Sequence, residues 1–316
     1  MMKRILLTAL LLATGAVALA QEYAVVNLSV CNMRRTADFD AEMISQALLG
    51  TPVHVLETDA KNWSRIQSPD TYTGWVHPAG IHLMTFDEYH AWNAAEKVMV
   101  TALQGIAYSK PSTASEPVSD LAGGDRVRYI GIEKWFYKVG FPDGRIGYIP
   151  RTVACKESVW RDNLDQSVPA ILATARSMTG FPYIWAGMSP KGMDCSGYVR
   201  TVLYLHDIII PRDAGPQSRV GQRIEHPDDF LPGDLVFFGK RDPKGEKDKV
   251  SHVAIYLGNK EFIHSIGIVK VGSFDPESPV YDAFNTGRML YASRILPYID
   301  QEEGLNTTLS NPYYAE

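Results

Sequence analysis

The chain has 316 residues, 45% of them hydrophobic and 21% charged, which is enough for two or three domains with sizeable cores. Its formal net charge of −5 at pH 7 provides no basic surplus for binding a nucleic acid. Beyond the N-terminus, no apolar stretch approaches the length of a membrane span. We therefore expect neither a nucleic-acid partner nor stable insertion into a membrane.

The N-terminal residues 1–20 have the layout of an export signal. Lys3 and Arg4 precede an apolar run over residues 5–12, and Ala18-Leu19-Ala20 places small residues at a cleavage site. The run is too short to cross a bilayer, and a cytosolic helix is the alternative interpretation. The sequence therefore predicts a signal peptide over residues 1–20, cleaved before Gln21, and an exported protein that we expect in the periplasm.

Residues 21–155 contain two related segments of short alternating runs. When the chain is shifted by 73 positions, the two segments show the same order of residue types. An apolar residue and a glycine come first, an aromatic and an aliphatic residue follow, and a glycine–aromatic–aliphatic strand closes each segment. Turn signals at Pro69-Asp70 and Pro142-Asp143-Gly144 lie in the same relative place. The pattern predicts two small β-barrels, over residues 21–85 and 101–160. The aligned pairs are Leu48 with Leu121, Gly50 with Gly123, Trp63 with Phe136, Ile66 with Val139, Gly74 with Gly147, Trp75 with Tyr148 and Val76 with Ile149.

A helical linker is expected between the barrels, over residues 86–100. Tyr89, Trp92, Ala95 and Val98 recur at helical spacing and form one apolar face of a helix from Phe86 to Met99. This face predicts packing against a neighbouring domain.

The second half begins with two helices that frame a cysteine. Residues 168–178 form a predicted helix that Gly180-Phe181-Pro182 ends, and residues 198–206 are apolar at helical spacing. Cys195 would therefore lie at the N-terminus of a buried helix, where free N–H groups and the helix dipole favour a thiolate. We expect this position to lower the pKa of the thiol and to provide N–H groups for an oxyanion.

Three strands follow, over residues 235–238, 251–257 and 261–265. His252 and His264 lie on the last two, which form a hairpin, and they share a face only if the turn contains an odd number of residues or a bulge. In that register Ala254 is opposite His264, and His252 is the diagonal neighbour of His264 on the same face. Cys195, His252 and His264 then form the nucleophile, base and orienting group of a cysteine hydrolase. A metal site of the same three residues is the alternative, although it lacks the closely spaced ligand pair usual for zinc.

The chain has three cysteines, an odd number, so at least one thiol stays unpaired within the chain. Export would permit a disulfide between Cys31 and Cys155. Two unpaired, buried cysteines are the other possibility.

Five motifs in the second half resemble the NlpC/P60 family of papain-like peptidases, in order and spacing. The resemblance implies an α+β catalytic domain over residues 161–300, a polar C-terminal tail over residues 301–316, and no cofactor. By the same resemblance Cys195 attacks the carbonyl, His252 is base and acid, His264 orients His252, and Tyr183 lies near the oxyanion. One small departure is Ala186, where the family usually has glycine. The motifs are Pro182-Tyr183-Ile184-Trp185-Ala186-Gly187, Asp194-Cys195-Ser196-Gly197-Tyr198-Val199, Pro232-Gly233-Asp234-Leu235-Val236-Phe237-Phe238, Ser251-His252-Val253-Ala254-Ile255-Tyr256-Leu257-Gly258 and Ile263-His264-Ser265.

The repeated first half resembles bacterial SH3 domains, and two of them ahead of an NlpC/P60 domain resemble γ-D-glutamyl-L-diamino-acid endopeptidases. That group hydrolyses the bond between γ-D-Glu and meso-diaminopimelate or L-Lys in peptidoglycan stem peptides with a free N-terminal L-Ala, and releases L-Ala-γ-D-Glu in murein recycling. In Pro211-Arg212-Asp213 the resemblance makes Asp213 a candidate for binding the substrate amine. It also implies D-Glu contacts for Asp194 and Ser196. Glu42 and Tyr72 are our candidates for the SH3 acid and tyrosine that bind the same amine.

Three other functions remain open at this stage. The same catalytic domain could serve a broader endopeptidase that remodels intact wall, with the SH3 domains as anchors. A non-catalytic wall-binding protein is a second possibility, although the presence of Cys195, His252 and His264 speaks against it. Lipid acyltransferase chemistry would require a membrane segment that the sequence lacks. Neither the oligomeric state nor the preferred diamino acid follows from the sequence.

Overall fold

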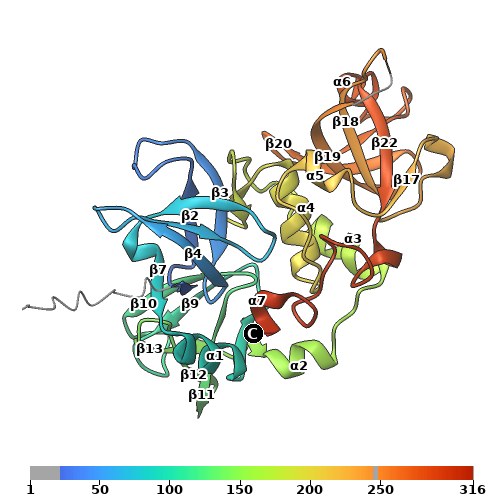
Figure 1. The fold of residues 1–316 in the computed structure, drawn as a ribbon. Helices are drawn as coiled ribbons and strands as arrows, with labels where there is room; N and C mark the ends of the chain where they lie inside the picture. Colours follow the sequence, from blue (N-terminus) through green and yellow to red (C-terminus); the bar gives the residue numbers. More distant parts are fainter. Residues whose placement is uncertain (1–21, 245–247, 316) are drawn as a thin grey trace, which may run out of the picture.

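The computed structural model describes residues 22–244 and 248–315. The predicted signal peptide, residues 1–20, lies outside the described residues. Figure 1 shows two small β-barrels, blue to green along the chain, beside a separate orange sheet, with the yellow helix α4 (Cys195–Tyr204) between them. The predicted α+β fold, with two all-β units ahead of a mixed domain, is confirmed.

The first barrel is one antiparallel sheet of seven strands in the order β3-β2-β6-β5-β4-β1-β7. Its core is a cluster of buried aliphatic side chains that includes Met33, Val53 and Ile66, with Cys31 among them. The short 3₁₀ helix η1 (Pro78–Gly80) precedes β7. The strands are β1 (Tyr23–Val26), β2 (Val30–Arg34), β3 (Met43–Leu48), β4 (Pro52–Thr58), β5 (Ser64–Gln67), β6 (Thr73–Val76) and β7 (Ile81–Met84).

The second barrel repeats this topology strand for strand, in the order β10-β9-β13-β12-β11-β8-β14. The alignment of the repeat is wrong at its first two pairs. Leu48, opposite Val30, matches Ala122, opposite Gln104, and not Leu121. Gly50 and Gly124, not Gly123, share a left-handed backbone, with φ of 80° and 98°. Their N–H groups donate to the carbonyls of Val26 and Val100 respectively, so the offset is 74 there and 73 only in the later strands. The strands are β8 (Lys97–Val100), β9 (Gln104–Tyr108), β10 (Pro117–Ala122), β11 (Arg126–Glu133), β12 (Phe136–Gly140), β13 (Ile146–Pro150) and β14 (Ala154–Lys156).

The helix between the barrels, α1 (Phe86–Ala94), is shorter than the sequence predicts. Thr85 and Glu88 form a capping box at its start, and Tyr89 and Trp92 are buried as expected. Residues 97–100 are strand β8 of the second barrel instead of a continued helix. The Lys97 ammonium donates to the carbonyls of Asn93 and Ala95 at 3.2 and 2.6 Å, and this contact ends the helix.

The catalytic half packs helices against a six-stranded antiparallel sheet in the order β17-β22-β18-β19-β20-β21. The side chains of α3 and α4 share one apolar core with the sheet, and that core includes Tyr198, Phe237 and Val253. A second apolar cluster covers the opposite face of the sheet. The elements are α2 (Glu157–Asp162), α3 (Val168–Ser177), β15 (Met188–Ser189), β16 (Gly192–Met193), α4, α5 (Ala214–Gln217), β17 (Gln222–Ile224), η2 (Pro227–Asp229), β18 (Leu235–Lys240), β19 (Lys249–Gly258), β20 (Glu261–Ile266), β21 (Ile268–Ser273), α6 (Ala283–Thr286), β22 (Met289–Arg294), η3 (Leu296–Tyr298) and α7 (Pro312–Ala315).

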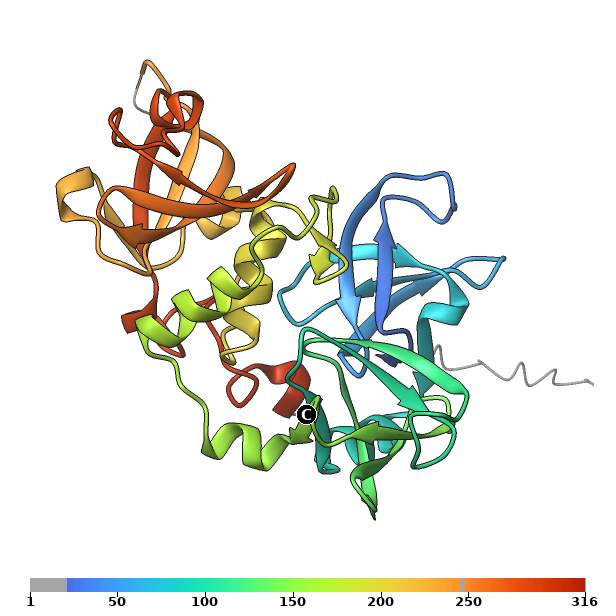
Figure 2. The same cartoon turned by 180° about the vertical axis from the view of Figure 1, so that it is seen from behind.

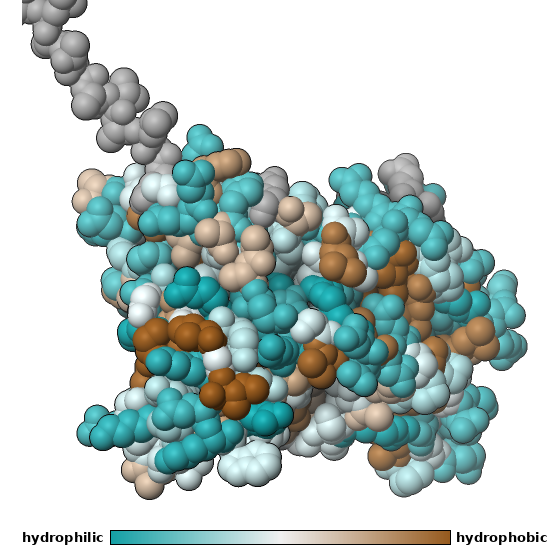
Figure 3. Space-filling view, turned by 90° about the horizontal axis from the view of Figure 1, so that it is seen from below, coloured by the Kyte–Doolittle hydropathy of each residue, from teal (hydrophilic) through white to brown (hydrophobic). Residues whose placement is uncertain are grey.

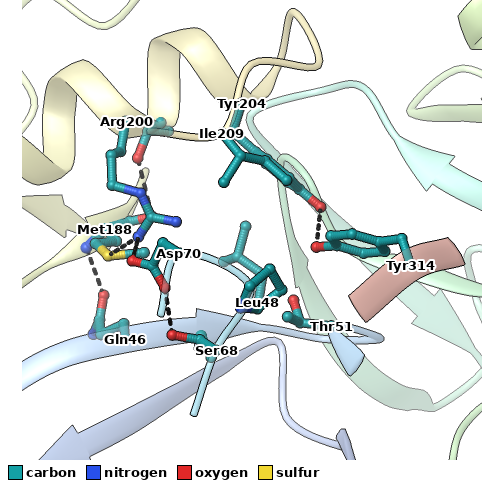
Figure 4. A pocket seen from close by; sticks show the side chains of 13 residues that line it. Gln46, Leu48, Thr51, Ser68, Asp70, Met188, Arg200, Tyr204, Ile209 and Tyr314 are labelled. Atoms are coloured by element: carbon teal, nitrogen blue, oxygen red, sulfur yellow. Dashed lines mark hydrogen bonds and ion pairs between the residues drawn. The ribbon is translucent and has the colours of Figure 1, made fainter. Parts of the chain in front are cut away.

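The first barrel contacts the catalytic domain directly, and Figure 4 shows this contact from close by. Arg200 on α4 reaches across to Asp70 in the β5–β6 turn, with 2.9 Å between Nη1 and Oδ2. The backbone N–H of Met188 donates to the side chain of Gln46 on β3 at 2.8 Å. Beside these contacts lies a cavity of about 40 Å³. A buried ion pair that loses one partner is strongly destabilising, so this contact holds the barrel in a defined position.

The C-terminal segment returns to the N-terminal half, as the red chain in Figure 2 shows. Tyr313 is buried, and its hydroxyl donates to Gln67 of β5 at 2.8 Å. Asn311 donates to the carbonyl of Pro69 at 2.8 Å, and the Tyr89 hydroxyl donates to the carbonyl of Tyr313 at 3.1 Å. Residues predicted as a polar tail therefore join the catalytic domain to the first barrel.

In the part of the chain that the structure describes, no helix is both long and apolar enough to cross a bilayer. The face drawn in Figure 3 carries apolar side chains in small patches that hydrophilic residues separate.

Candidate active site

One cavity of about 550 Å³ lies between the first barrel and the catalytic domain. It brings together every site residue that the sequence predicts except His264, which lies behind His252. Glu42 and Tyr72 come from the first barrel, and the others come from the catalytic domain. The predicted residues that line it are Glu42, Tyr72, Tyr183, Asp194, Cys195, Ser196, Asp213 and His252.

Cys195 is the first residue of α4, as the sequence predicts. Asp194 is the N-cap, and its carboxylate accepts the N–H of Gly197 at 2.7 Å. The expected low thiol pKa, however, is wrong. Burial and then the nearby Asp194 carboxylate raise the pKa of Cys195 to about 11, although the N–H groups of Val253 and Ser196 act in the opposite direction. The resting nucleophile is therefore a thiol that needs a base to remove its proton.

His252 and His264 share one face of the β19–β20 hairpin. Ile255 is opposite Ile263, which places Ala254 opposite His264 and confirms the predicted register. The turn itself has only two residues, Asn259 and Lys260, both with positive φ. A bulge between Tyr256 and Gly258 adds one unpaired residue to β19, and this brings His252 and His264 to the same face.

The two imidazoles are joined by a hydrogen bond of 2.8 Å between His252 Nε2 and His264 Nδ1. Aromatic rings hold both in place: Phe238 lies 5.6 Å from His252 and Phe262 lies 5.1 Å from His264, between ring centroids. Because Nε2 of His252 is occupied, Nδ1 is the nitrogen that remains to accept a proton from Cys195.

Both histidines are neutral at pH 7. Burial lowers the pKa of His252 to about 3, with His264 and Arg288 acting in the same direction. Burial also lowers the pKa of His264 to about 4, against the opposing charge of Asp282. A neutral His252 can serve as a base, so the pair complements the protonated thiol.

The histidine pair predicts a loss of stability in mild acid. The unfolded chain takes up protons at these histidines near pH 6.5, but the folded protein does so only near pH 3 and 4, so stability falls as the pH drops through this window. Between pH 7 and pH 5 the cost is about 2 kcal/mol for each histidine. Urea unfolding at both pH values measures the loss, and His264→Gln, which cannot titrate, should reduce it by about half. An equal loss in this variant would contradict the assignment.

The base of the cavity is a buried network around Arg212. The guanidinium donates to both oxygens of Asp194, at 3.2 and 2.7 Å, and to the Ser196 hydroxyl at 2.9 Å. The Asp194 carboxylate also accepts the N–H of Ala186 at 3.0 Å. The polar atoms of Asp194 and Ser196 are thus bound within the protein, and Arg212 fixes the helix start that carries Cys195.

Acidic groups from two domains meet at the side of the cavity formed by the first barrel. Tyr72 and Asp213 lie near each other, and burial and then the Asp213 carboxylate raise the pKa of the Tyr72 hydroxyl to about 12. Burial raises the pKa of Asp213, with the Arg212 charge and the Tyr72 hydroxyl opposing it. Glu42 accepts from Trp185 Nε1 at 3.1 Å and from Arg35 Nε at 2.8 Å. An exposed carboxylate beside a tyrosine can pair with an ammonium group that enters the cavity.

Tyr183 lies near the nucleophile, where burial and the charges of Cys195 and Asp194 raise its pKa to about 12. Its hydroxyl therefore keeps its proton and can donate a hydrogen bond.

Sequence reasoning missed several functional candidates. Arg288 and Phe284, from the segment around α6, line the cavity on the side of Cys195. Trp185 and Arg212 lie within motifs that resemble the family, but nothing in those motifs alone indicates a role for either side chain. Arg35 has no local motif, and only the fold brings it to the cavity.

The two alternatives for the cysteines are resolved in the described residues. Cys31, Cys155 and Cys195 are all free, so the possible Cys31–Cys155 disulfide is not formed. No group of three or more His, Cys, Asp or Glu side chains in residues 22–244 and 248–315 is arranged to hold a metal ion.

Comparisons with known proteins match both halves of the chain. Residues 180–288 match the NlpC/P60 family, and residues 33–81 match the bacterial dipeptidyl-peptidase Sh3 domain. A relative named gamma-D-glutamyl-L-lysine dipeptidyl-peptidase, from Bacillus cereus, is 31% identical over 233 residues, which cover 70% of this chain and 66% of that protein, just under two thirds. Dipeptidyl-peptidase 6 of Lysinibacillus sphaericus is 26% identical over 275 residues, which cover 82% of this chain and 94% of the relative.

Among solved structures, the chain is similar to an NlpC/P60 family protein from Bacillus cereus. The two agree with a TM-score of 0.72 at 25% sequence identity, over 87% of this chain and 100% of the other. The similarity therefore extends through both barrels and the catalytic domain.

Proposed function

Because this chain belongs to the NlpC/P60 family of cysteine peptidases, we propose that it hydrolyses the bond between γ-D-Glu and a diamino acid in peptidoglycan stem peptides. The observation that carries the proposal is the cavity that holds Cys195 and His252 beside the acidic groups of the barrel side. The relatives' names, which specify a γ-D-glutamyl-L-lysine bond and a dipeptidyl-peptidase, support the same reaction.

In the proposed reaction the Cys195 sulfur attacks the γ-carbonyl carbon of D-Glu while its proton passes to His252 Nδ1. The N–H groups at the start of α4 and the Tyr183 hydroxyl stabilise the oxyanion. His252 then protonates the departing amine, the C–N bond breaks, and a thioester remains. Water, activated by His252, hydrolyses the thioester, and the thiol regains its proton.

The substrate we propose has a free N-terminal L-Ala, so the product is L-Ala-γ-D-Glu. Asp213 with Tyr72, and Glu42 held by Trp185, offer carboxylates for the ammonium group from two domains. A peptide amine is free only after the stem peptide has left the glycan, which favours a role in murein recycling. The predicted export signal, outside the described residues, supports action in the periplasm.

Mass spectrometry of the products tests this function. Incubation with L-Ala-γ-D-Glu-meso-diaminopimelate, and with the L-Lys analogue, should give L-Ala-γ-D-Glu and the free diamino acid. Cleavage of the γ-D-Glu–diaminopimelate bond in intact sacculi at a comparable rate, which leaves L-Ala-γ-D-Glu attached to the glycan, would favour the broader wall-remodelling endopeptidase. Recovery of uncleaved peptide under all conditions would contradict the proposal.

A further inference from the structure

The second histidine of the site has a ring nitrogen with no hydrogen-bond partner. His264 is fully buried, and among the described residues its Nε2 has no hydrogen-bond partner. A buried polar nitrogen without a partner is costly, so such an atom at a catalytic site calls for an explanation.

The proposed reaction determines which proton each nitrogen carries. His252 Nδ1 must be bare to accept the thiol proton, so neutral His252 carries its proton on Nε2. That proton is donated to His264 Nδ1 across the 2.8 Å contact. Neutral His264 must then carry its own proton on Nε2, which makes the unpartnered atom a donor directed away from His252.

Asp282 is the carboxylate near this donor. Its Oδ2 lies 3.9 Å from His264 Nε2, which is beyond a hydrogen bond but close enough for a strong charge interaction. Asp282 is the N-cap of α6, and Asn285 donates to it from its backbone at 3.0 Å and from its side chain at 2.6 Å. The Asp282 N–H also donates to the carbonyl of Ser273 on β21, so its position is fixed.

The packing beneath Asp282 also favours its approach. Gly272 on β21 has no side chain, and a Cβ there would lie 2.8 Å from the Phe262 ring and 3.4 Å from the Asp282 Cβ. The same glycine thus makes room for the ring that packs on His264 and for the carboxylate.

The titratable and charged groups around His264 come from β19, from β21 and from both ends of α6. His252 lies on β19, Lys270 is opposite His264 on β21, Arg288 follows α6, and Asp282 precedes it. Asp282 is the one anion in this group, and it raises the pKa of both imidazoles. Arg288 opposes it at both, and Lys270 opposes it at His264. Burial raises the pKa of Asp282 itself, but the Asn285 hydrogen bonds together with the charges of His264 and Lys270 outweigh burial and lower this pKa, so the group stays ionised.

We propose that Asp282 is a positioning residue that completes a chain of Cys195, His252, His264 and Asp282. It selects the His264 tautomer that accepts from His252, and it stabilises the positive charge that forms when His252 takes the thiol proton. His252 can pass its Nε2 proton to His264, and the charge then lies beside the carboxylate. The inference rests on the proposed function, because that function requires His252 Nδ1 as the base.

Asp282→Asn tests the proposal, because asparagine can keep the helix cap but has no charge. We expect kcat to fall roughly tenfold with KM nearly unchanged, since the charge acts on the transition state through His264. Asp275→Asn is the matched control. It removes a carboxylate from the same β21–α6 connection, where Asp275 lies 3.7 Å from Lys260, and it should leave kcat unchanged.

Two further measurements separate positioning from a structural role. Removing the anion should lower the pKa of both histidines in an NMR titration and shift the acid limb of kcat/KM to lower pH. A loosened site would instead admit water and raise both pKa values toward 6.5. In a His264→Gln background, Asp282→Asn should add less than about a twofold loss, since the two residues act in series.

An upward or absent pKa shift, or an undiminished loss in the His264→Gln background, would overturn the proposal. The NMR titration needs no substrate. A downward shift in a protein that cleaves no stem peptide would therefore refute the proposed function and leave the Asp282 contact standing.

Discussion

Replacing Cys195 with alanine should abolish peptide hydrolysis and leave the fold intact. Cys195 is the only cysteine in the cavity, and no other described nucleophile of its kind lies beside His252. Removing the nucleophile of a catalytic triad lowers kcat by about a millionfold in a well-studied hydrolase, so no turnover above background is expected. Product mass spectrometry measures activity, and circular dichroism with urea unfolding verifies the fold.

Cys155→Ala is the matched control for this variant. Cys155 lies on β14 of the second barrel, outside the cavity, and burial raises the pKa of its thiol. This variant should retain full activity. Iodoacetamide should inactivate the wild type with labelling at Cys195, at a rate that depends on His252. Turnover by the Cys195→Ala variant at the wild-type rate would remove the cysteine-peptidase mechanism.

Capping the substrate's amino group should slow cleavage about a hundredfold. An N-acetyl or lactyl group removes the ammonium charge and leaves Asp213 without a counterion. Asp213 is exposed in the empty cavity, and a bound peptide would cover it. An unpaired carboxylate that is fully buried costs about 3–5 kcal/mol, and water that still reaches Asp213 reduces this cost, so we expect about 3 kcal/mol, or roughly a hundredfold. The ratio of kcat/KM for L-Ala-γ-D-Glu-meso-diaminopimelate and its N-acetyl form measures the effect.

Asp213→Asn provides the internal control for amine recognition. This variant should lose most of its activity on the free peptide, and free and capped peptides should then be cleaved at similar rates. Similar rates on both peptides by the wild type would indicate a cavity that ignores the amine. That result would favour a wall-remodelling endopeptidase over the dipeptide-releasing enzyme.

The sequence predicts the parts of the site that depend on strand parity and helix position. Strand alternation limits the hairpin to two registers, and the requirement that His252 and His264 share a face selects the one with Ala254 opposite His264, which the structure has. The helix start at Cys195 follows from the apolar spacing after it, and the structure has α4 begin at that residue.

Other features depend on burial, which local sequence does not report. The pKa of Cys195 was expected to fall because of the helix dipole, but its burial outweighs that effect. The apolar spacing predicts a helix from Phe86 to Met99, but residues 97–100 form strand β8, which pairs with β11 and β14 in the second barrel. Tertiary pairing overrides helical spacing in such short segments.

The position of Asp282 beside His264 is another feature that the local sequence does not predict. Asp282 is separated from His264 by a strand and a loop, and its only local signal is an N-cap pattern, Asp282 followed three residues later by Asn285. N-caps are common at the start of helices, so this pattern does not indicate a role near the nucleophile. Only the fold shows that the cap and the buried imidazole are 3.9 Å apart.

The bulge in the β19–β20 hairpin absorbs the one extra residue of its longer strand, Leu257. Deleting Leu257 would leave Tyr256 opposite Phe262 above the same two-residue turn, so the hairpin would become regular and His264 would keep its face. Deleting Ile263 from the body of β20 would instead turn His264 to the opposite face. Loss of one residue should therefore be tolerated at the bulge, whereas the same loss within β20 should disable the site without altering any catalytic side chain.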